Sequence, residues 1–208
     1  MKIGIDIDDT INERHANDIQ LAVSFCKENN IDYNSLNISK MEAKDMLHLN
    51  EELWVKFMNI SFPRNVNESP TKPNAVILIN KLISEGHDVY IITSRKPDYD
   101  KEGQPYKGWM MKRDTLKWLK EKGFNISEDH ILFGISEKGK YCKDNGFDVL
   151  VDDSIDHAEN CILHHIPCIL MTQSYNFSLL EKYKNSPYLL NAKNDWKEVY
   201  QIIHNRLK

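Results

Sequence analysis

The sequence predicts an α/β fold, a Rossmann-like, doubly wound parallel sheet with helices on both faces. Two observations predict it. Short, near-continuous runs of β-branched and other apolar residues recur along the 208 residues, and such runs are typical of strands that are buried on both faces. Helical patterns separate most of these runs, and strands that alternate with helices build parallel βαβ units.

Each predicted strand is a short run rich in Val, Ile and other apolar residues. In chain order these runs are "KIGIDI" at 2–7, "DVYIITS" at 88–94, "HILFG" at 130–134, "DVLVD" at 148–152 and "PCILMT" at 167–172. The predicted helices between them cover residues 74–85, 109–122, 136–145 and 154–165. A glycine follows each of the first three helices and Pro167 follows the fourth, and both residue types commonly end helices.

Residues 12–73 interrupt the alternation. This segment contains helical patterns, including the stretch "NEELWVKFMN", but no convincing strand, and it ends in the Pro-bearing "SFPRNVNESPTKPN". We interpret it as a small helical cap inserted after the first strand. The catalytic core is then predicted to consist of residues 1–11 and 74–208. A second polar loop, "KPDYDKEGQPYKG" at 96–108, follows the second strand.

Composition narrows the class of partner and the compartment. A net charge of −4 argues against a duplex nucleic acid partner, because proteins that bind one usually carry a basic stripe. We expect no membrane association, since no apolar run approaches the ~18 residues needed to cross a bilayer. The four cysteines form no CxxC pair and the N-terminus shows no basic and apolar leader, so we expect a cytoplasmic location.

Polar side chains gather where the predicted strands end. The first strand ends in "DIDDT" at 6–10, the second in "TSR" at 93–95 and the fourth in "DDS" at 152–154, while the third leads into "SEKGK" at 136–140. Ligands of open α/β sheets bind at the carboxyl ends of the strands. Carboxylates crowded at one edge repel one another unless a divalent cation joins them, and hard oxygen ligands suit Mg²⁺. A single Asp at a strand end is more often a helix cap, but the ordered set favours a site.

These residues carry a resemblance to a known family. "DIDDT" is similar to the DxDxT/V signature of the haloacid dehalogenase-like phosphohydrolases, and "YIITS" resembles their second motif. Lys138 and "VLVDDS" resemble the third and fourth motifs, and all four occur in family order. One large subgroup has its helical cap between the first two motifs. Three features most resemble the deoxyribonucleotidase-like, cytosolic type C 5′-nucleotidase branch of the family. These are the size of the insertion at 12–73, the "TSR" at 93–95 and the segment "KGKYCKDNGFDVLVDDS".

The resemblance implies a phosphatase that acts through an aspartyl phosphate. Asp6 would attack phosphorus, and Asp8 would protonate the leaving oxygen and then activate water. Two residues apart on an extended chain, they point to the same face. Thr93 would donate a hydrogen bond to a phosphoryl oxygen, and Lys138, with Lys140 as the reserve, would neutralise Asp6 and the transferring group.

The resemblance also implies a set of Mg²⁺ ligands. These are the Asp6 carboxylate, the backbone carbonyl of Asp8 and Asp153, while Asp152 either supports them or binds the metal directly. Which of the adjacent pair Asp152 and Asp153 touches the metal stays open. Asp9 and Thr10 are expected to shape the turn.

Selectivity is expected to come from segments that close over the leaving group. Aromatic surface beside a phosphate site suits a stacked base, so we expect a small phosphorylated metabolite, a nucleoside monophosphate, as substrate. The predicted substrate-binding residues are Ser94, Arg95, Trp54, Phe57 and Arg64; Phe62, Tyr99 and Tyr106 can also reach the leaving group. Trp54, Phe57 and Met58 are at helical spacing, and such residues are more often packed core than ligand contacts.

Two alternatives to a nucleotidase stay open. One is another enzyme, either a phosphotransferase or a sugar-phosphate or other metabolite phosphatase, and the other is a phosphoacceptor or binding protein without turnover. The sequence also leaves open the preference for 5′ or 3′ esters and the oligomeric state, a homodimer included.

Two further patterns are weaker. "GISEKGKY" at 134–141 fits the GxxxxGK phosphate loop, but Tyr141 stands where a Ser or Thr would bind Mg²⁺. His157, Cys161 and His165 share a helical face at a spacing that suits zinc. Apolar residues lie beside them, which favours buried packing.

Overall fold

A computed structural model describes residues 1–34, 37, 40, 43–47, 49–100 and 105–207. Within these residues the strands form one sheet in the order β3-β2-β1-β4-β5-β6, and every neighbouring pair is parallel. The strands are β1 (Lys2–Ile5), β2 (Asp88–Ile92), β3 (Ile131–Leu132), β4 (Val149–Asp152), β5 (Cys168–Leu170) and β6 (Leu189–Asn191). The predicted fold class is confirmed.

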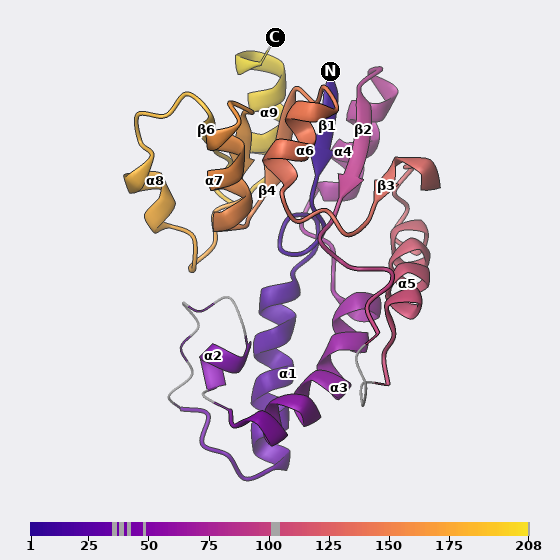
Figure 1. Ribbon diagram of the computed structural model, residues 1–208, viewed down its shortest axis with the longest axis vertical. Coiled ribbons are helices and arrows are strands. Elements are labelled where there is room, and N and C mark those ends of the chain that lie inside the picture. Colours follow the sequence, from indigo (N-terminus) through magenta and orange to yellow (C-terminus); the bar gives the residue numbers. More distant parts are fainter. Residues whose placement is uncertain (35–36, 38–39, 41–42, 48, 101–104, 208) are drawn as a thin grey trace.

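Helices connect the strands and supply the part of the molecule that extends away from the sheet (Figure 1). They are α1 (Arg14–Glu28), α2 (Ala43–Leu47), α3 (Glu51–Glu68), α4 (Ala75–Ser84), α5 (Gly108–Glu121), α6 (Lys138–Asp144), α7 (Ile155–Leu163), α8 (Ser178–Lys182) and α9 (Trp196–Arg206), with a 3₁₀ turn, η1, at Glu128–His130.

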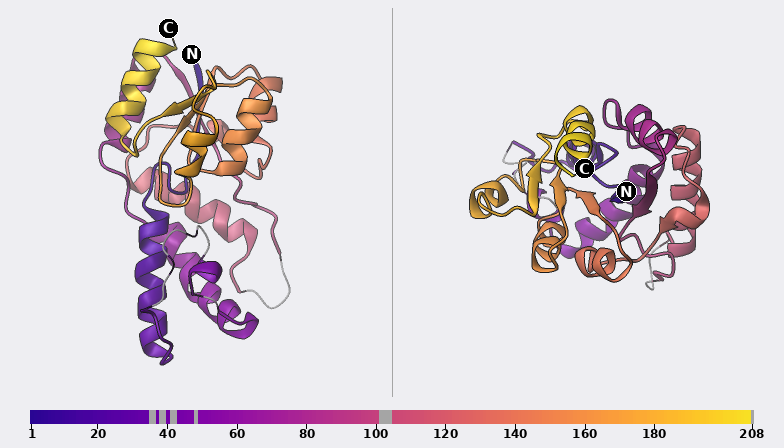
Figure 2. Two further views of the ribbon diagram at one scale, coloured as in Figure 1. Left: turned by 90° about the vertical axis from the view of Figure 1, so that its left-hand side faces the viewer. Right: turned by 90° about the horizontal axis from the view of Figure 1, so that it is seen from above.

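The sheet is buried on both faces because successive side chains of each strand point to opposite sides. On β4, Val149 and Val151 pack in one apolar cluster and Leu150 packs in another. Helices α4, α5 and α9 contribute to the first cluster, and α6, α7 and α8 contribute to the second. Figure 2 shows α9 and the α6–α7 pair on opposite sides of the strands.

The strand order places the candidate site. The chain leaves β1 to form β2 on one side of it and later returns to form β4 on the other side. The crossover connections therefore diverge between β1 and β4, which opens a crevice at the carboxyl ends of these two strands. Asp6 directly follows β1, and Asp152 is the last residue of β4.

Helices α1, α2 and α3 lie beyond this crevice and form their own apolar cluster (Figure 1). Two connecting segments join them to the sheet, and these run side by side through an antiparallel bridge between Asn12 and Thr71. Lys72 fastens the pair, since its ammonium lies 3.0 Å from Glu13 Oε2 and its amide donates to the carbonyl of Ile11 at 2.9 Å. We refer to the three helices as the cap.

The C-terminal part of the chain holds elements that the sequence patterns did not indicate. Strand β6 is three residues long and half-buried throughout, too short for a recognisable period. Helix α9 follows it and covers β1 through Trp196 and Val199, both fully buried. The predicted first strand is also shorter than expected, because it ends at Ile5 where a tight turn begins. No helix among the described residues combines the length and apolarity needed to cross a membrane.

Candidate active site

A tight turn after β1 positions the acidic residues of the "DIDDT" motif. The amides of Thr10 and Ile11 both donate to the carbonyl of Ile7, at 3.3 and 3.0 Å. Asp9 takes the left-handed conformation with φ 55°, which Asp tolerates better than most residues. Its carboxylate accepts a hydrogen bond from the His15 amide at 2.7 Å. Asp9 therefore holds the start of α1 rather than facing the reactive edge.

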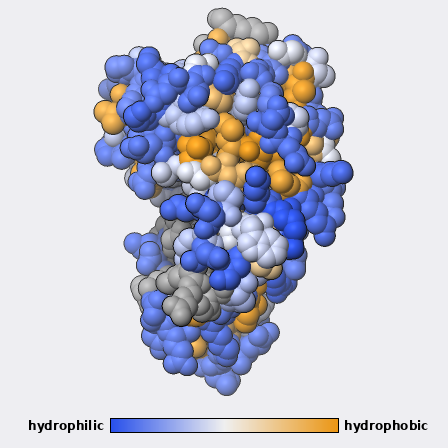
Figure 3. Space-filling view, turned by 45° about the vertical axis from the view of Figure 1, so that its right-hand side comes forward, coloured by the Kyte–Doolittle hydropathy of each residue, from blue (hydrophilic) through white to orange (hydrophobic). Residues whose placement is uncertain are grey.

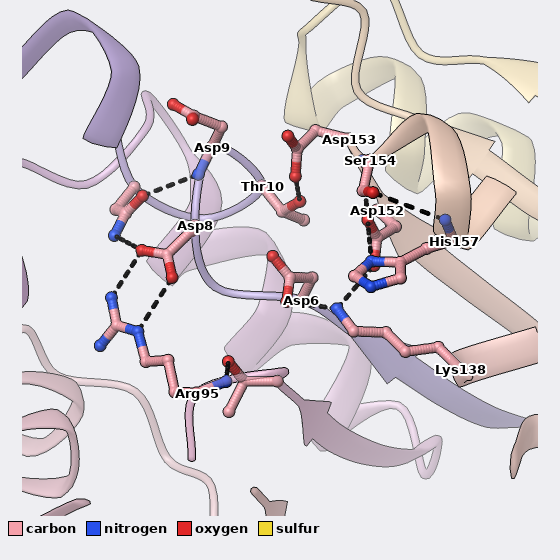
Figure 4. Close-up of polar contacts among 12 residues, drawn as sticks. Asp6, Asp8, Asp9, Thr10, Arg95, Lys138, Asp152, Asp153, Ser154 and His157 are labelled. Atoms are coloured by element: carbon pink, nitrogen blue, oxygen red, sulfur yellow. Dashed lines mark hydrogen bonds and ion pairs between the residues drawn. The ribbon is translucent and has the colours of Figure 1, made fainter. Parts of the chain in front are cut away.

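Lys138 lies at the centre of the site, where it joins two carboxylates from different strands. Its side chain is fully buried, and its ammonium contacts Asp6 and lies 2.7 Å from Asp152 Oδ2 (Figure 4). Burial lowers the pKa of Lys138, but Asp152 and Asp6 outweigh it and raise the pKa above its ordinary value. The lysine therefore stays charged and offsets one of the two negative charges.

The approach of α6 to α7 explains why Lys138 rather than Lys140 reaches the site. Gly139 lies against the backbone of α7, and a Cβ at this position would meet the carbonyl of Asn160 at 2.4 Å. Lys138, the first residue of α6, is thereby pressed toward the sheet. Lys140 instead projects outward, with half of its side chain exposed, and pairs with Asp144.

Asp152 is held by neighbours on several sides. Its Oδ1 accepts a hydrogen bond from the Ser154 amide at 2.8 Å and lies 3.0 Å from His157 Nδ1, while Oδ2 faces Lys138. Burial raises the pKa of the Asp152 carboxyl, but His157 and Lys138 outweigh this and bring it below its ordinary value. Asp152 is therefore an anion that positions Lys138.

Asp153 completes a cluster of three buried carboxylates. Oxygens of Asp6, Asp152 and Asp153 lie within 4.8 Å of one another. Thr10 Oγ1 donates to Asp153 Oδ1 at 3.1 Å, and the Tyr175 hydroxyl donates to its other oxygen. Burial and then the charge of Asp152 raise the pKa of Asp153 well above its ordinary value.

This cluster fits a hard divalent cation. Burial raises the pKa of Asp6 to about 6 even against the effect of Lys138, so the buried charges are not balanced by the lysine alone. A divalent cation would stabilise the ionised forms, and an all-oxygen donor set is the one that Mg²⁺ prefers. The Asp152 carboxylate accepts from the Lys138 ammonium and the Ser154 amide, whereas the Asp153 carboxylate accepts from the hydroxyls of Thr10 and Tyr175.

Asp8 lies on the other side of Asp6 and is paired with Arg95. The guanidinium makes a two-pronged contact, with Nε 2.9 Å from Oδ2 and Nη2 2.6 Å from Oδ1. Figure 4 shows this carboxylate turned toward Arg95 and away from Lys138. Burial raises the pKa of Asp8, but Arg95 outweighs it and holds the pKa below its ordinary value. A further bond from Arg95 Nη1 to Thr115 Oγ1, 2.8 Å long, anchors the guanidinium.

The end of β2 contributes the "TSR" residues. Thr93 is 1% exposed and continues the ladder to β3 through its amide, which donates to the carbonyl of Leu132 at 2.9 Å. Its Oγ1 accepts the Arg95 amide at 3.2 Å. Ser94 is exposed between these two buried residues and faces the cavity described next.

A cavity of about 370 Å³ adjoins Asp8 between the cap and the sheet. Its lining residues come from the turn after β1, from α1, α3 and α5, and from the segment after β2: Asp8, Arg14, Met58, Asn59, Phe62, Asn65, Val66, Ser94, Arg95, Lys96, Tyr99, Tyr106 and Met111. The lining combines aromatic rings with three basic side chains. In the space-filling view the molecule narrows between its upper body and the mostly hydrophilic cap (Figure 3).

Comparisons with known proteins find relatives of low sequence identity and a shared fold. No protein family model matches the chain. A Bacillus cereus protein with the name "Putative nucleotidase" is 29% identical over 133 residues, 63% of this chain and 59% of its own length. An Oceanobacillus iheyensis protein, also named a "Putative nucleotidase", is 22% identical over 183 residues, 85% of this chain and 89% of its own. The aligned part thus spans less than two thirds of the Bacillus cereus relative.

A solved haloacid dehalogenase-like hydrolase from Streptococcus pneumoniae superposes over nearly the whole length. The TM-score is 0.65 at 13% identity, and 97% of each chain is covered. The fold is that of the haloacid dehalogenase-like hydrolases. At this low identity the similarity shows the fold, and the chemistry has to be argued from the residues of this chain.

Within this haloacid dehalogenase-like fold, the predicted site residues fall into three groups. Asp6, Asp152, Asp153 and Lys138 meet at the edge of the sheet, and Asp8, Ser94 and Arg95 line the cavity beside it. Trp54, Phe57 and Arg64 lie elsewhere. Phe57 is 1% exposed inside the cap, with its ring 5.4 Å from Phe25 and 6.1 Å from Trp54, and Arg64 pairs with Glu68.

Helical geometry explains why Trp54 and Phe57 do not line the cavity. Positions 54 and 57 of α3 face α1, whereas 58, 62, 65 and 66 face the cavity. The sequence does show positions 58, 62, 65 and 66 as a second face of the helix, but no local sequence feature indicates which of the two faces meets the site. His157, which contacts Asp152, is a further residue of the site that the sequence did not predict, because the spacing of His157 and Cys161 within α7 gives no sign of a partner on β4.

Proposed function

We propose that this chain is a Mg²⁺-dependent phosphomonoesterase that acts through an aspartyl phosphate on Asp6. The observation that carries the proposal is the buried Asp6 carboxylate held by Lys138 beside Asp153, with a second carboxylate, Asp8, between it and the cavity. A nucleophile, a charge-neutralising lysine, a cation-binding pair and a group for proton transfer are what phosphoryl transfer through a carboxylate requires.

The first half-reaction transfers the phosphoryl group to Asp6. A carboxylate oxygen of Asp6 forms a bond to phosphorus while the bond to the leaving oxygen breaks. Asp8, in its protonated form, gives its proton to that leaving oxygen. Lys138 and the Thr93 hydroxyl offset charge on the phosphoryl oxygens, and bound Mg²⁺ would supply further positive charge there through Asp6 and Asp153.

The second half-reaction regenerates the enzyme. Asp8, now a carboxylate, takes a proton from water, and the water oxygen forms a bond to phosphorus. The bond between phosphorus and Asp6 then breaks and releases inorganic phosphate. Asp8 thus returns to its protonated form, and the cycle consumes one water molecule for each ester.

The ion pair between Asp8 and Arg95 places a condition on this cycle. While Arg95 grips both oxygens, Asp8 cannot carry a proton to the leaving group. Arg95 has to shift its contact, and an anionic substrate in the adjoining cavity offers the guanidinium a second partner. Substrate binding is therefore proposed to release Asp8, which then takes up a proton from solvent and can serve as the acid of the first half-reaction.

We propose a nucleoside monophosphate as the substrate. The cavity volume of about 370 Å³ lies within the range of small-molecule sites. Phe62 and Tyr106 form an edge-to-face pair with ring centroids 5.7 Å apart, and Tyr99 lines the same cavity. Aromatic rings suit a stacked base, and the names of the two relatives point in the same direction. A sugar phosphate is the second candidate, because Asn59 in the lining offers an amide to hydroxyl groups.

A phosphatase panel tests the proposal. The purified chain is assayed with Mg²⁺ against 5′ and 3′ nucleoside monophosphates, sugar phosphates, phosphoamino acids and a small artificial ester, with Asp6→Asn as the control for contaminating activity. Nucleotides are expected to give the highest kcat/KM. A panel led by sugar phosphates would shift the substrate assignment. A stable phosphoprotein without turnover would refute the enzyme.

A further inference from the structure

A second group of metal-binding side chains lies at the opposite end of the sheet from the candidate active site. Among the described residues, Glu85, His87 and His204 each bring one ligand atom to within 4.8 Å of the others. Glu85 follows α4, His87 immediately precedes β2, and His204 belongs to α9. The candidate active site follows the other end of β2, so the two groups are separated by the length of a strand (Figure 1).

The backbone fixes two of these ligands. Helix α4 ends in a turn in which Gly86 has φ +85°, and the amides of Gly86 and His87 donate to the carbonyls of Ile83 and Leu82 at 3.0 and 3.1 Å. A glycine in this left-handed conformation is a common way to end a helix. Because the turn is hydrogen-bonded at both residues, Glu85 and His87 are presented on a rigid loop.

Helix α9 orients the third ligand. His204 Nδ1 lies 3.0 Å from the carbonyl of Tyr200, one turn earlier, and its Nε2 lies 2.9 Å from Glu85 Oε2. The Tyr200 hydroxyl donates to the other oxygen, Glu85 Oε1, at 2.6 Å. Metal-binding histidines and carboxylates commonly use their second polar atom in this way, which fixes the atom that faces the metal.

We propose that Glu85, His87 and His204 bind a divalent transition metal of the zinc type and thereby clip α9 to the loop between α4 and β2. Two imidazoles and one carboxylate form a set that zinc uses, whereas Mg²⁺ prefers oxygen alone. Water would take the fourth position. The hydrogen bond between Glu85 and His204 gives way on binding, and its proton leaves to solvent.

The geometry requires only a small adjustment. Ligand atoms about 2.0–2.2 Å from zinc are roughly 3.3 Å apart in a tetrahedron, so the 2.9 Å contact of Glu85 with His204 has to open slightly. Both side chains are partly exposed and can move. Lys81 lies 3.9 Å from Glu85 Oε1, on the side that Tyr200 holds. Its charge opposes the cation, and we expect weaker binding than at a closed site with four protein ligands.

Cobalt spectroscopy tests the site separately from the catalytic carboxylates. The full chain is titrated with Co²⁺ and then Zn²⁺ in excess Mg²⁺, so that the oxygen-only cluster is occupied. We expect one equivalent of Co²⁺ with the intense visible absorption of a four-coordinate site, which Zn²⁺ abolishes. His204→Gln and His87→Gln should weaken binding by at least about tenfold, and Tyr200→Phe should weaken it by about tenfold. His164→Gln, the same change at a distant position, should bind as the wild type does.

A second measurement reports the proposed clip. Zn²⁺ should slow amide hydrogen exchange in α9 in the wild type and in His164→Gln but not in His204→Gln, with circular dichroism confirming that each variant is folded. The proposal is wrong if Co²⁺ gives the same spectrum in the wild type and in both ligand variants, or if zinc leaves exchange in α9 unchanged. Neither readout depends on phosphatase activity.

Discussion

Removing the Lys138 ammonium should be far more damaging than removing that of Lys140, two residues later. Lys138→Met leaves Asp6 and Asp152 buried without their shared cation. Breaking a buried ion pair from one side typically costs about 3–5 kcal/mol, a large share of the roughly 5–15 kcal/mol that holds a domain folded. Lys140 contacts only Asp144 at the surface, so Lys140→Met should unfold like the wild type.

Urea unfolding of both variants at pH 7.5 measures the difference, and a phosphatase assay at saturating Mg²⁺ follows the function. Lys138→Met should also lose about 10²-fold or more in kcat, on the scale of a lost charge-stabilising contact. Lys140→Met should keep wild-type turnover. Equal effects of the two substitutions, on stability or on rate, would refute the role assigned to Lys138.

The pH dependence of the stability difference follows from the signs of the shifts. The pKa of Lys138 is raised in the folded state. Its contribution to the free energy of unfolding is therefore complete below the pKa of an unfolded lysine, about 10.4, and is undiminished at neutral pH. The pKa of Asp6 is raised to about 6, so its ionisation disfavours the folded state above that pH. Acidification below about pH 6 protonates Asp6, and the difference between Lys138→Met and the wild type should shrink there.

Three further predictions concern the reaction. Asp6→Asn should abolish both turnover and formation of the phosphoenzyme. Asp8→Asn should lose about 10²-fold or more in kcat because proton transfer is impaired. Incubation with a ³²P-labelled substrate distinguishes the two variants, because only Asp6→Asn should carry no label. Arg95→Met should raise KM for nucleotides. It should also raise the pKa of Asp8 in the pH profile of kcat/KM, because the effect of burial on that pKa is then no longer outweighed by the guanidinium. An unchanged profile would contradict the release of Asp8 by substrate. Phe62→Ala should raise KM for nucleotides by roughly fivefold or more if one base is stacked, but leave KM for a small artificial ester unchanged. Phe57→Ala should chiefly lower the free energy of unfolding, by roughly 3–5 kcal/mol, which urea titration measures.

The sequence alone determined the fold class and the chemical character of one edge. Near-continuous apolar runs indicate buried strands, and acidic or hydroxyl residues at their carboxyl ends predict where a ligand binds. These signals are local, since a strand and the residue that follows it are neighbours in the chain. Asp6 and Asp152 could therefore be recognised before any packing was known. The C-terminal β6 was not predicted because a strand of three residues has no measurable period. Helix α9 does carry a helical spacing, in Trp196, Val199 and Ile203, but was not among the predicted elements.

Only the tertiary structure decided which side chains meet. The lysine of the site was ambiguous in sequence, and the close packing of Gly139 against Asn160 selects Lys138. The pair of Asp8 with Arg95 joins the segments that follow two different strands, and its strength depends on burial that no local pattern encodes.

The cap also shows that the sequence does not determine which face of a helix meets a site. From the sequence, the aromatic residues on either face of α3 could contact a ligand equally well: residues 54 and 57 lie on one face and residue 62 on another. The orientation of α3 against α1 turns Phe57 inward and Phe62 toward the cavity. Likewise, His204 meets Glu85 across 119 positions of sequence. A helical period states that a helix has faces, but which face meets which neighbour depends on contacts between distant segments, and these exist only in the folded chain.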